Sequence, residues 1–294
     1  LLFGPSSPFL GQNIIDNIGQ NIMKQLQNTL SSSSNLENQN DINRSLINAG
    51  LPMNEINEMI ESTKNNLLCD SNCQRDRKSR ELRNTIYNAE QTCCGQPAYN
   101  AGFWDEAKEV GTKFLNDFSE QNYIVSPSAS CTGMVKNSYN DLFFNTAIHN
   151  KCRNIQGHIY ELSEFLVHVA KKDYFGAELL GKAVYHDSCS ALRECKIKEE
   201  PRLLLSKVLG LELVEMKDNE VCCGFGGTFA VKFDGISTAM AEQKVMNALD
   251  TGAEYIISTD ASCLLQLQSY INEQKLPIKT MHLADVLATG WGNV

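Results

Sequence analysis

The segment NEVCCGFGGTF, residues 219–229, is the part of this sequence from which the fold class can be worked out. It places Cys222 and Cys223 side by side and follows them with three glycines in four positions. Adjacent thiols pack poorly, and glycine loses more backbone freedom on folding than any other residue. Taken alone, the segment is compatible with a chance pair in a glycine-rich loop or with a vicinal disulfide. The three glycines are Gly224, Gly226 and Gly227.

A second copy of the pair makes chance a poor explanation. The segment EQTCCGQPAYN places Cys93, Cys94 and Gly95 in the same order. Each pair precedes a strand-like segment that ends in a cysteine, Cys131 in NYIVSPSASC and Cys263 in EYIISTDASC. The two pairs lie 129 positions apart, and the two later cysteines lie 132 positions apart. The chain therefore carries an internal duplication whose period is that of one small domain.

Composition narrows the class of protein. The 294 residues, 42% hydrophobic and 21% charged, are enough for two globular domains of ordinary size. The formal net charge of −9 disfavours nucleic acid and anionic membranes as partners. No apolar run approaches the roughly 20 residues that cross a bilayer, and no signal peptide is recognisable. Eleven cysteines, an odd number in a long chain, indicate a cytoplasmic metal or cluster protein rather than a secreted disulfide framework.

Three regions are expected along the chain. Residues 1–91 are rich in Asn and read as an atypical segment of helices and linker. Residues 92–175 are expected to form the first repeat, which is incomplete, and residues 176–294 the second. Helical and strand patterns alternate in both repeats. This alternation predicts an α/β fold of two duplicated, three-layer-like units with mostly parallel sheets.

A cysteine recurs where a strand is followed by a helix. Apolar periodicity predicts helices over 103–118, 157–172 and 236–253, and strands over 123–128, 211–216 and 254–258. Cys131, Cys189 and Cys263 each follow a predicted strand and begin a predicted helix. The carboxyl ends of strands are where α/β sheets bind ligands, and helix N-termini stabilise thiolates.

Four thiols of the second repeat are expected to converge at one end of its sheet: Cys189, Cys222, Cys223 and Cys263. Four cysteine ligands suit tetrahedral zinc or an iron–sulfur cluster. Zinc sites usually space their cysteines by two or more residues, whereas adjacent side chains diverge and suit a cluster of several irons. The glycines let the backbone fold around a large cofactor and present N–H groups to its sulfurs. An iron–sulfur cluster is therefore favoured, with zinc as the alternative.

Residues 91–294 resemble the cysteine-rich CCG domain proteins, and most closely the lactate-utilisation branch of that family. The family includes the cysteine-rich component of heterodisulfide reductase and the iron–sulfur subunits of glycolate oxidase and anaerobic glycerol-3-phosphate dehydrogenase. The matching stretches are TCCGQPAYNAGFWDEAK, SPSASCTGMVK, YELSEFLV, YHDSCSALRE, CCGFGGTFAVKF, TGAEYIISTDASCL and HLADVLA.

The resemblance implies an iron–sulfur electron-transfer subunit of a lactate oxidation system, working with a ferredoxin-like partner subunit. It implies a 4Fe–4S cluster on the four cysteines of the second repeat. A weaker site is implied on Cys93, Cys94 and Cys131 of the first repeat, with Gly95 and the three glycines after Cys223 as loop support. Whether the chain is itself catalytic stays open. The alternative is a non-enzymatic structural or interaction protein, viral or chimeric, that keeps the fold with zinc or no metal.

The sequence departs from the family pattern in two ways. The stretches CTGM and CLLQ, at 131–134 and 263–266, lack the second cysteine of the Cys-x-x-Cys that many members carry. The repeat offset also places the counterpart of Cys189 at Ile60, in a stretch with a helical pattern. The first repeat thus keeps three family cysteines, unless Cys69 or Cys73 completes it.

Overall fold

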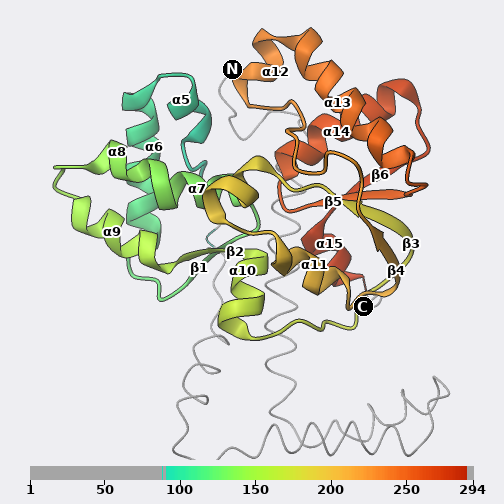
Figure 1. Ribbon diagram of the computed structural model, residues 1–294. Coiled ribbons are helices and arrows are strands. Elements are labelled where there is room, and N and C mark those ends of the chain that lie inside the picture. Colours follow the sequence, from blue (N-terminus) through green and yellow to red (C-terminus); the bar gives the residue numbers. More distant parts are fainter. Residues whose placement is uncertain (1–87, 89–90, 290–294) are drawn as a thin grey trace, which may run out of the picture. The chain divides into compact units, whose positions relative to one another are not determined.

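The computed structural model describes residue 88 and residues 91–289, which form an α/β structure with two parallel sheets (Figure 1). The expectations for residues 1–87, including Cys69 and Cys73, lie outside the described residues. No helix in the described part of the chain combines the length and the apolar character needed to span a membrane.

The first half of the described chain carries the smaller sheet. Its elements are α5 (Gln96–Asn100), α6 (Trp104–Phe118), β1 (Ile124–Ser126), α7 (Ala129–Gly133), the π-helical turn η3 (Met134–Ser138), α8 (Tyr139–Phe143), α9 (His149–His158), β2 (Ile159–Glu161), α10 (Leu162–Glu164) and the π-helical turn η4 (Phe165–Ala170). Strands β1 and β2 pair in parallel, with Ile124 opposite Ile159 and Ser126 opposite Glu161. Apolar residues of α6, η3, α8 and α9 bury one another and the two isoleucines in a single core.

The second half carries a four-stranded parallel sheet with the strand order β4-β3-β5-β6. Its elements are β3 (Glu178–Tyr185), the π-helical turn η5 (Ser190–Cys195), α11 (Glu199–Leu205), β4 (Leu209–Val214), α12 (Thr228–Lys232), α13 (Asp234–Leu249), β5 (Tyr255–Ser258), α14 (Ala261–Gln274), β6 (Lys279–His282) and α15 (Leu283–Ala288). All three strand pairs are parallel, so the carboxyl ends of the four strands meet at one edge.

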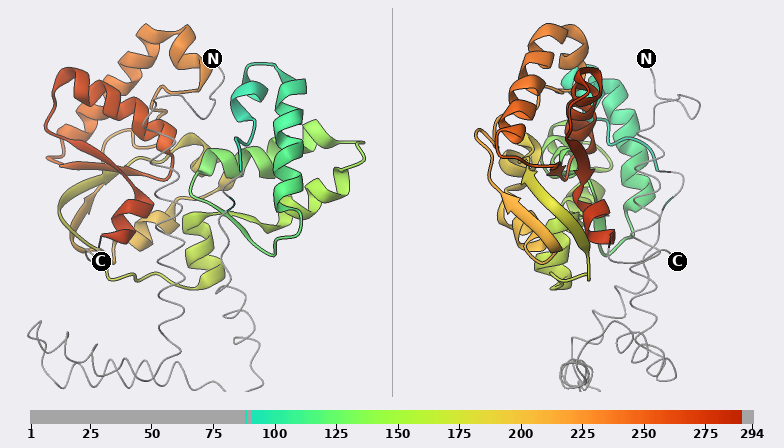
Figure 2. Two further views of the ribbon diagram at one scale, coloured as in Figure 1. Left: turned by 180° about the vertical axis from the view of Figure 1, so that it is seen from behind. Right: turned by 90° about the vertical axis from the view of Figure 1, so that its right-hand side faces the viewer.

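Alternation along the central strands explains the layers of the second half. Val184 of β3 and Ile256 of β5 pack in a core with apolar residues of α13 and α14. Tyr185 and Ile257, one position later, are also fully buried, and they point to the opposite face because side chains alternate along a strand. Helices α11 and α15 lie on that side, as the front view (Figure 1) and the rear view (Figure 2) show. A sheet between two layers of helices is the expected architecture.

The two halves share an order of elements. In each half two helices follow the Cys–Cys–Gly segment, and then come a strand, a helical stretch, a second strand and a further helix. The helical stretch between the strands is α14 alone in the second half, whereas in the first half it comprises α7, η3, α8 and α9. Within this order Ser126 and Glu161 end β1 and β2, as Ser258 and His282 end β5 and β6. The predicted helices over 103–118 and 236–253 and the strands before Cys131 and Cys263 are present.

The helix predicted over 157–172 is wrong in its first part, because Ile159–Glu161 is strand β2. Isoleucine and tyrosine favour strands, and pairing with β1 satisfies the backbone polar groups of this segment. Glu161 then caps the next helix, since its carboxylate accepts the N–H groups of Ser163 at 2.7 Å and Glu164 at 3.2 Å. The strand predicted over 211–216 begins and ends two residues earlier than predicted, at Leu209 and Val214.

Contacts between the halves cluster at the carboxyl ends of the strands. Helix α7 of the first half packs against η5 of the second, where Ala129, Ala191 and Ile197 form a small buried cluster. Nε2 of His282 lies 2.8 Å from the carbonyl oxygen of Pro127. These contacts set the strand ends of both sheets beside each other, and the cysteines lie at those ends.

Candidate metal centre

The Cys–Cys–Gly loop of the second half is closed by its glycine. Gly224 has φ +90° and donates its N–H to the sulfur of Cys222 at 3.4 Å. A Cβ at Gly224 would lie 2.5 Å from the carbonyl oxygen of Ser237, so only glycine fits without movement of backbone. The hydroxyl of Ser237 donates to the Gly224 carbonyl at 2.8 Å and anchors the loop to α13. Gln266, the last residue of CLLQ, donates to the Ser237 hydroxyl at 2.8 Å.

The structure brings together the four thiols expected to converge. The Cys222 thiol contacts those of Cys189 and Cys223, and the Cys223 thiol contacts that of Cys263. Hydrogen bonds from Cys189 and Cys223 hold the pKa of Cys222 far below its usual value. The same hydrogen bonds raise the pKa values of Cys189 and Cys223 well above the usual range. The group therefore stabilises a thiolate, which is the form that binds metal.

A histidine that the sequence argument missed adjoins this group. His186 is fully buried just after β3, and one ring nitrogen and the sulfurs of Cys223 and Cys263 all lie within 4.8 Å of one another. Neither ring nitrogen has a hydrogen-bond partner among the described residues. Burial, with the positive charge of Lys244, lowers the pKa of His186 to about 3, so the ring is neutral. Its signal in the sequence is a polar residue that directly follows the buried end of a strand, in VYHDSC.

A buried ion pair fixes the loop between His186 and Cys189. Asp187 is 1% exposed, and its two carboxylate oxygens accept hydrogen bonds from Arg202 of α11 at 2.8 and 2.7 Å. The guanidinium also lies over the Tyr185 ring, 5.2 Å from its centroid, and donates to Glu215 at 2.7 Å. The carboxylates of Asp187 and Glu215 raise the pKa of Arg202 above its ordinary value. The two parallel hydrogen bonds from its guanidinium to Asp187 hold the loop in one orientation.

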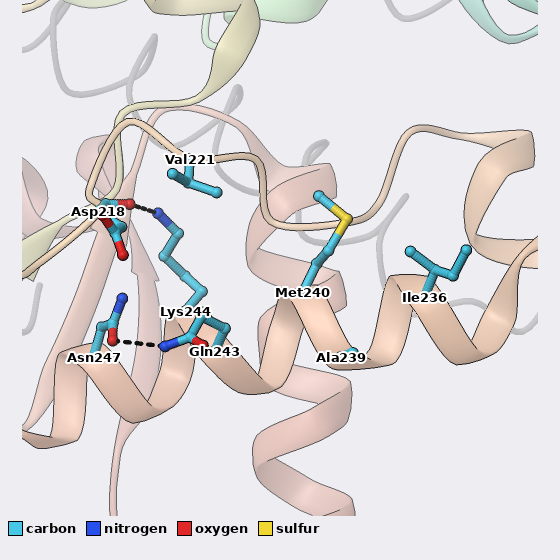
Figure 3. Close-up of a pocket in the computed structure, with 8 residues that line it drawn as sticks. All are labelled: Asp218, Val221, Ile236, Ala239, Met240, Gln243, Lys244 and Asn247. Carbon is cyan, nitrogen blue, oxygen red and sulfur yellow. Dashed lines mark hydrogen bonds between the residues drawn. The ribbon is translucent and has the colours of Figure 1, made fainter.

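A buried ammonium lies on the other side of the Cys–Cys–Gly loop. Lys244 projects from α13 beside a groove that Val221 and Met240 help to line (Figure 3). Its ammonium donates to the carbonyls of Asp218 and Asn219, the latter at 3.1 Å. Burial lowers the pKa of Lys244 to about 8, although the nearby cysteines favour its charged form. The ammonium therefore offsets negative charge on the clustered cysteines, of which Cys222 and Cys223 are near it.

The first half repeats the loop on a smaller group. Gly95 has φ +86° and donates its N–H to the sulfur of Cys93 at 3.4 Å. The buried thiol of Cys94 lies in hydrogen-bond contact with those of Cys93 and Cys131, and these contacts lower the pKa of Cys93 to about 6 and lower that of Cys131. The pKa of Cys94 rises well above its usual value. The hydroxyl of Tyr139 donates to the Cys94 carbonyl at 2.9 Å and holds the loop.

One buried carboxylate joins the two cysteine groups. Asp260, which precedes α14, accepts hydrogen bonds from the hydroxyls of Ser128 at 3.2 Å and Ser130 at 2.7 Å. Its other oxygen accepts the hydroxyl of Ser188 at 2.6 Å. Ser130 directly precedes Cys131, and Ser188 directly precedes Cys189. The two groups are therefore positioned through a shared residue.

The donor set fits a bound metal or iron–sulfur cluster. Four cysteine sulfurs meet at the carboxyl ends of the strands, beside the imidazole of His186, whose nitrogens form no hydrogen bond with any described residue. The N–H of Gly224 donates to one of these sulfurs. Two other described thiols have structural surroundings: Cys152 is buried and donates to the Tyr139 carbonyl at 3.8 Å, and Cys195 donates to the Ala129 carbonyl at 3.4 Å. The sites implied for cysteines 93, 94 and 131, and for the four of the second half, thus coincide with the clustered thiols.

Comparisons with known proteins agree with this geometry. A family model described as "Cysteine-rich domain" (CCG) matches residues 77–136 and 183–268, which include both cysteine groups. Lactate utilization protein A of Lysinibacillus sphaericus (strain C3-41) is 44% identical over 199 residues, 67% of this chain and 87% of that protein. The protein of that name from Geobacillus sp. (strain WCH70) is 42% identical over 197 residues, 67% of this chain and 83% of the relative. Lactate utilization protein A 2 of Bacillus cereus (strain Q1) is 41% identical over 201 residues, 68% of this chain and 83% of the relative.

Proposed function

The chain belongs to the cysteine-rich domain (CCG) family, as a relative of the lactate utilization A proteins, and from this we propose that it is an iron–sulfur electron-transfer subunit of a lactate oxidation system. The names of the relatives supply the substrate class. The chemistry of the chain itself supplies the reaction class, because clustered thiols at a sheet edge hold redox metals.

The convergence of four thiols from three segments is the observation that carries the proposal. Cys189, Cys222, Cys223 and Cys263 would hold a cluster of the 4Fe–4S type. A bound cluster would supply a one-electron carrier. The Gly224 N–H, already directed at a cysteine sulfur, would lower the energy of negative charge there. Burial of Cys223 and Cys263 keeps water from that side of the site.

The thiols of the first half form a second, weaker site in this proposal. Cys93, Cys94 and Cys131 would give a cluster three sulfurs, with one position left for another ligand. Asp260 connects this group to the cysteines of the second half, because it accepts hydrogen bonds from the hydroxyls of Ser130 and Ser188. The two sites would therefore be held in a fixed relative position.

The oxidation of the 2-hydroxy acid itself is assigned to a partner. A ferredoxin-like iron–sulfur subunit is the proposed exchange partner. We place the chain in the cytoplasm, because the nine cysteines in the described part of the chain are all free thiols.

Anaerobic purification with iron and acid-labile sulfide analysis tests the proposal. We expect both elements, a brown colour with absorption near 400 nm, and reversible bleaching by dithionite. A Cys222→Ser variant should lose most of this absorption, whereas Cys152→Ser, a buried thiol in the apolar core, should keep it. Zinc without sulfide would overturn the proposal and favour a structural role for the fold. A cluster that dithionite cannot reduce would overturn the electron-transfer role.

A further inference from the structure

His186 breaks a general rule of protein interiors. The side chain is 0% exposed, and both ring nitrogens lack a hydrogen-bond partner in the described part of the chain. Buried polar atoms are nearly always paired, since leaving one unpaired costs its hydration without a compensating hydrogen bond. Two unpaired nitrogens in one ring therefore require an explanation.

A second buried histidine shows what ordinary pairing looks like in this fold. His282 also ends a strand of the same sheet, and its Nδ1 accepts the N–H of Ala284 at 3.1 Å. Its Nε2 lies 2.8 Å from the carbonyl oxygen of Pro127 and 3.1 Å from that of Thr259. Both of its nitrogens are used within the protein, so burial at a strand end does not by itself leave a ring without partners.

The surroundings of His186 offer metal-binding atoms in place of hydrogen-bond partners. The sulfurs of Cys223 and Cys263 lie within 4.8 Å of a ring nitrogen and of each other, yet neither ring nitrogen forms a hydrogen bond with a described residue, an arrangement that suits ligands sharing one centre. The Asn219 carbonyl lies close enough to the ring to favour its protonated form, but it is not in hydrogen-bond geometry with either ring nitrogen, and it accepts a hydrogen bond from Lys244 at 3.1 Å. A histidine that binds metal through one nitrogen commonly directs the other at a backbone carbonyl.

We propose that His186 is a nitrogen ligand of the metal centre held by Cys189, Cys222, Cys223 and Cys263, which makes the second-half site a mixed sulfur–nitrogen site. The inference rests on the proposed function, since it assigns a further donor to that centre. The ring contributes a neutral nitrogen where a further cysteine would contribute an anionic sulfur. A less negative ligand set raises the reduction potential of an iron–sulfur centre, as the histidine ligands of Rieske centres do.

Nitrogen hyperfine coupling in the reduced protein tests the ligand directly. The full chain is purified anaerobically in two forms, with natural histidine and with ¹⁵N-histidine, reduced with dithionite, and measured by pulsed EPR. Coupling of directly bound nitrogen, scaled between the two forms by the ratio of the nuclear gyromagnetic ratios, supports the assignment. The measurement needs no variant and therefore does not depend on whether a substitution folds.

Two variants then identify the residue. His186→Gln should lose the histidine coupling and change the visible absorption, and His282→Gln should keep both. Iron and sulfide in the wild-type protein without any histidine coupling would overturn the inference and leave the proposed function intact. Histidine coupling that persists in His186→Gln would also overturn it. A wild-type protein without iron and sulfide would overturn the proposed function and this inference together.

Discussion

In both halves of the molecule, a Cys–Cys–Gly turn closes with the glycine N–H 3.4 Å from the sulfur of the first cysteine, and a later cysteine enters a helix behind a strand. The halves differ in the additional metal-binding side chains that lie beside the loop. In the second half β3 ends near the loop, and the segment that follows it places His186 and Cys189 there. In the described part of the first half, β1 and β2 are the strands present, and three thiols meet.

The comparison separates the loop from the site. The loop needs only a glycine in the left-handed region and an anchor, Tyr139 in the first half and Ser237 in the second. A complete donor set also needs the strand that precedes the loop in the chain. The same Cys–Cys–Gly sequence can therefore belong to two sites with different numbers of ligands. The number depends on whether a strand that precedes the loop supplies further metal-binding side chains.

The largest expected effect is on bound iron. Cys222→Ser should abolish most of it, because the Cys222 sulfur contacts two of the other three thiols of its group, those of Cys189 and Cys223. Cys94→Ser should remove less, because a cluster on three thiolates has an open position and is labile. Iron and sulfide counts per chain after anaerobic purification measure the difference, with Cys152→Ser as the control.

The N-terminal cysteines Cys69 and Cys73 test whether the first site really has one ligand fewer than the second. If Cys69 or Cys73 completes the first site, replacing both should remove as much iron as Cys94→Ser does. Equal losses from Cys94→Ser, Cys222→Ser and the double replacement would show that both sites are complete. The first half would then not be the weaker one.

The next effect is on stability, at the buried ion pair of Asp187 and Arg202 beside the cysteines of the second half. Arg202→Met leaves Asp187 buried without its partner, which should cost about 3–5 kcal/mol of unfolding free energy. Denaturant titration measures this loss. Replacing both residues, as Asp187→Leu with Arg202→Met, should recover much of the stability, since the unpaired charge is then gone.

The exposed pair Lys198–Glu220 is the control for this experiment. Its atoms are 2.6 Å apart, but both side chains are about half exposed. Lys198→Met should therefore leave the denaturation midpoint unchanged. A loss below about 1 kcal/mol in Arg202→Met would show that the cysteine loop does not depend on the ion pair.

A third effect belongs to the first half and depends on pH. Burial raises the pKa of Glu161 to about 7, above its ordinary value of 4.5. Because the folded pKa is the higher one, the stability that this group contributes is fully present below pH 4.5 and is lost as pH rises through 7. Glu161→Gln cannot ionise, so it should match the wild type below pH 4.5 and exceed its stability at pH 8, by on the order of 3 kcal/mol.

Urea titrations of both proteins at several pH values measure this difference. Other titrating groups cancel, because only the difference between variant and wild type is read. His282 occupies the equivalent strand end in the second half, so the variant tests a feature of the first half alone. A difference that does not change between pH 5 and 8 would contradict the raised pKa.

Much of the fold could be predicted from the sequence, for identifiable reasons. The strands before Cys131 and Cys263 are short apolar runs that end at turn residues and precede a helical pattern, so local order gives their type. Segment 157–172 failed because its apolar residues fit a helix as well as a strand, and only pairing with the distant β1 decides. The four thiols of the second half could be proposed from strand ends. His186 was missed although it directly follows a predicted strand, because what distinguishes it from other histidines, its lack of hydrogen-bond partners among the described residues, is a property of the folded interior.

The smallest expected effect compares glycines that share a backbone conformation. Gly102, Gly95 and Gly224 have φ values of +85°, +86° and +90°, so alanine at each should lose about 1–2 kcal/mol for the left-handed conformation. Their surroundings differ. A Cβ at Gly102 meets nothing within 4 Å, whereas at Gly95 it would lie 3.0 Å from the Ala107 carbonyl oxygen.

At Gly224 a Cβ would lie 2.5 Å from the Ser237 carbonyl oxygen and 2.9 Å from the Met240 Cβ, and neither atom ends a flexible side chain. Gly224→Ala should therefore lose about 1–3 kcal/mol more than Gly102→Ala, with Gly95→Ala between them. Denaturation midpoints of the three variants measure the order. The clash at Gly224 would also displace the N–H from the Cys222 sulfur, so this variant should lose bound iron while Gly102→Ala keeps it. Equal losses of stability in all three variants would mean that the second-half loop is no more tightly packed than the first, and that the strand beside it alone distinguishes the two sites.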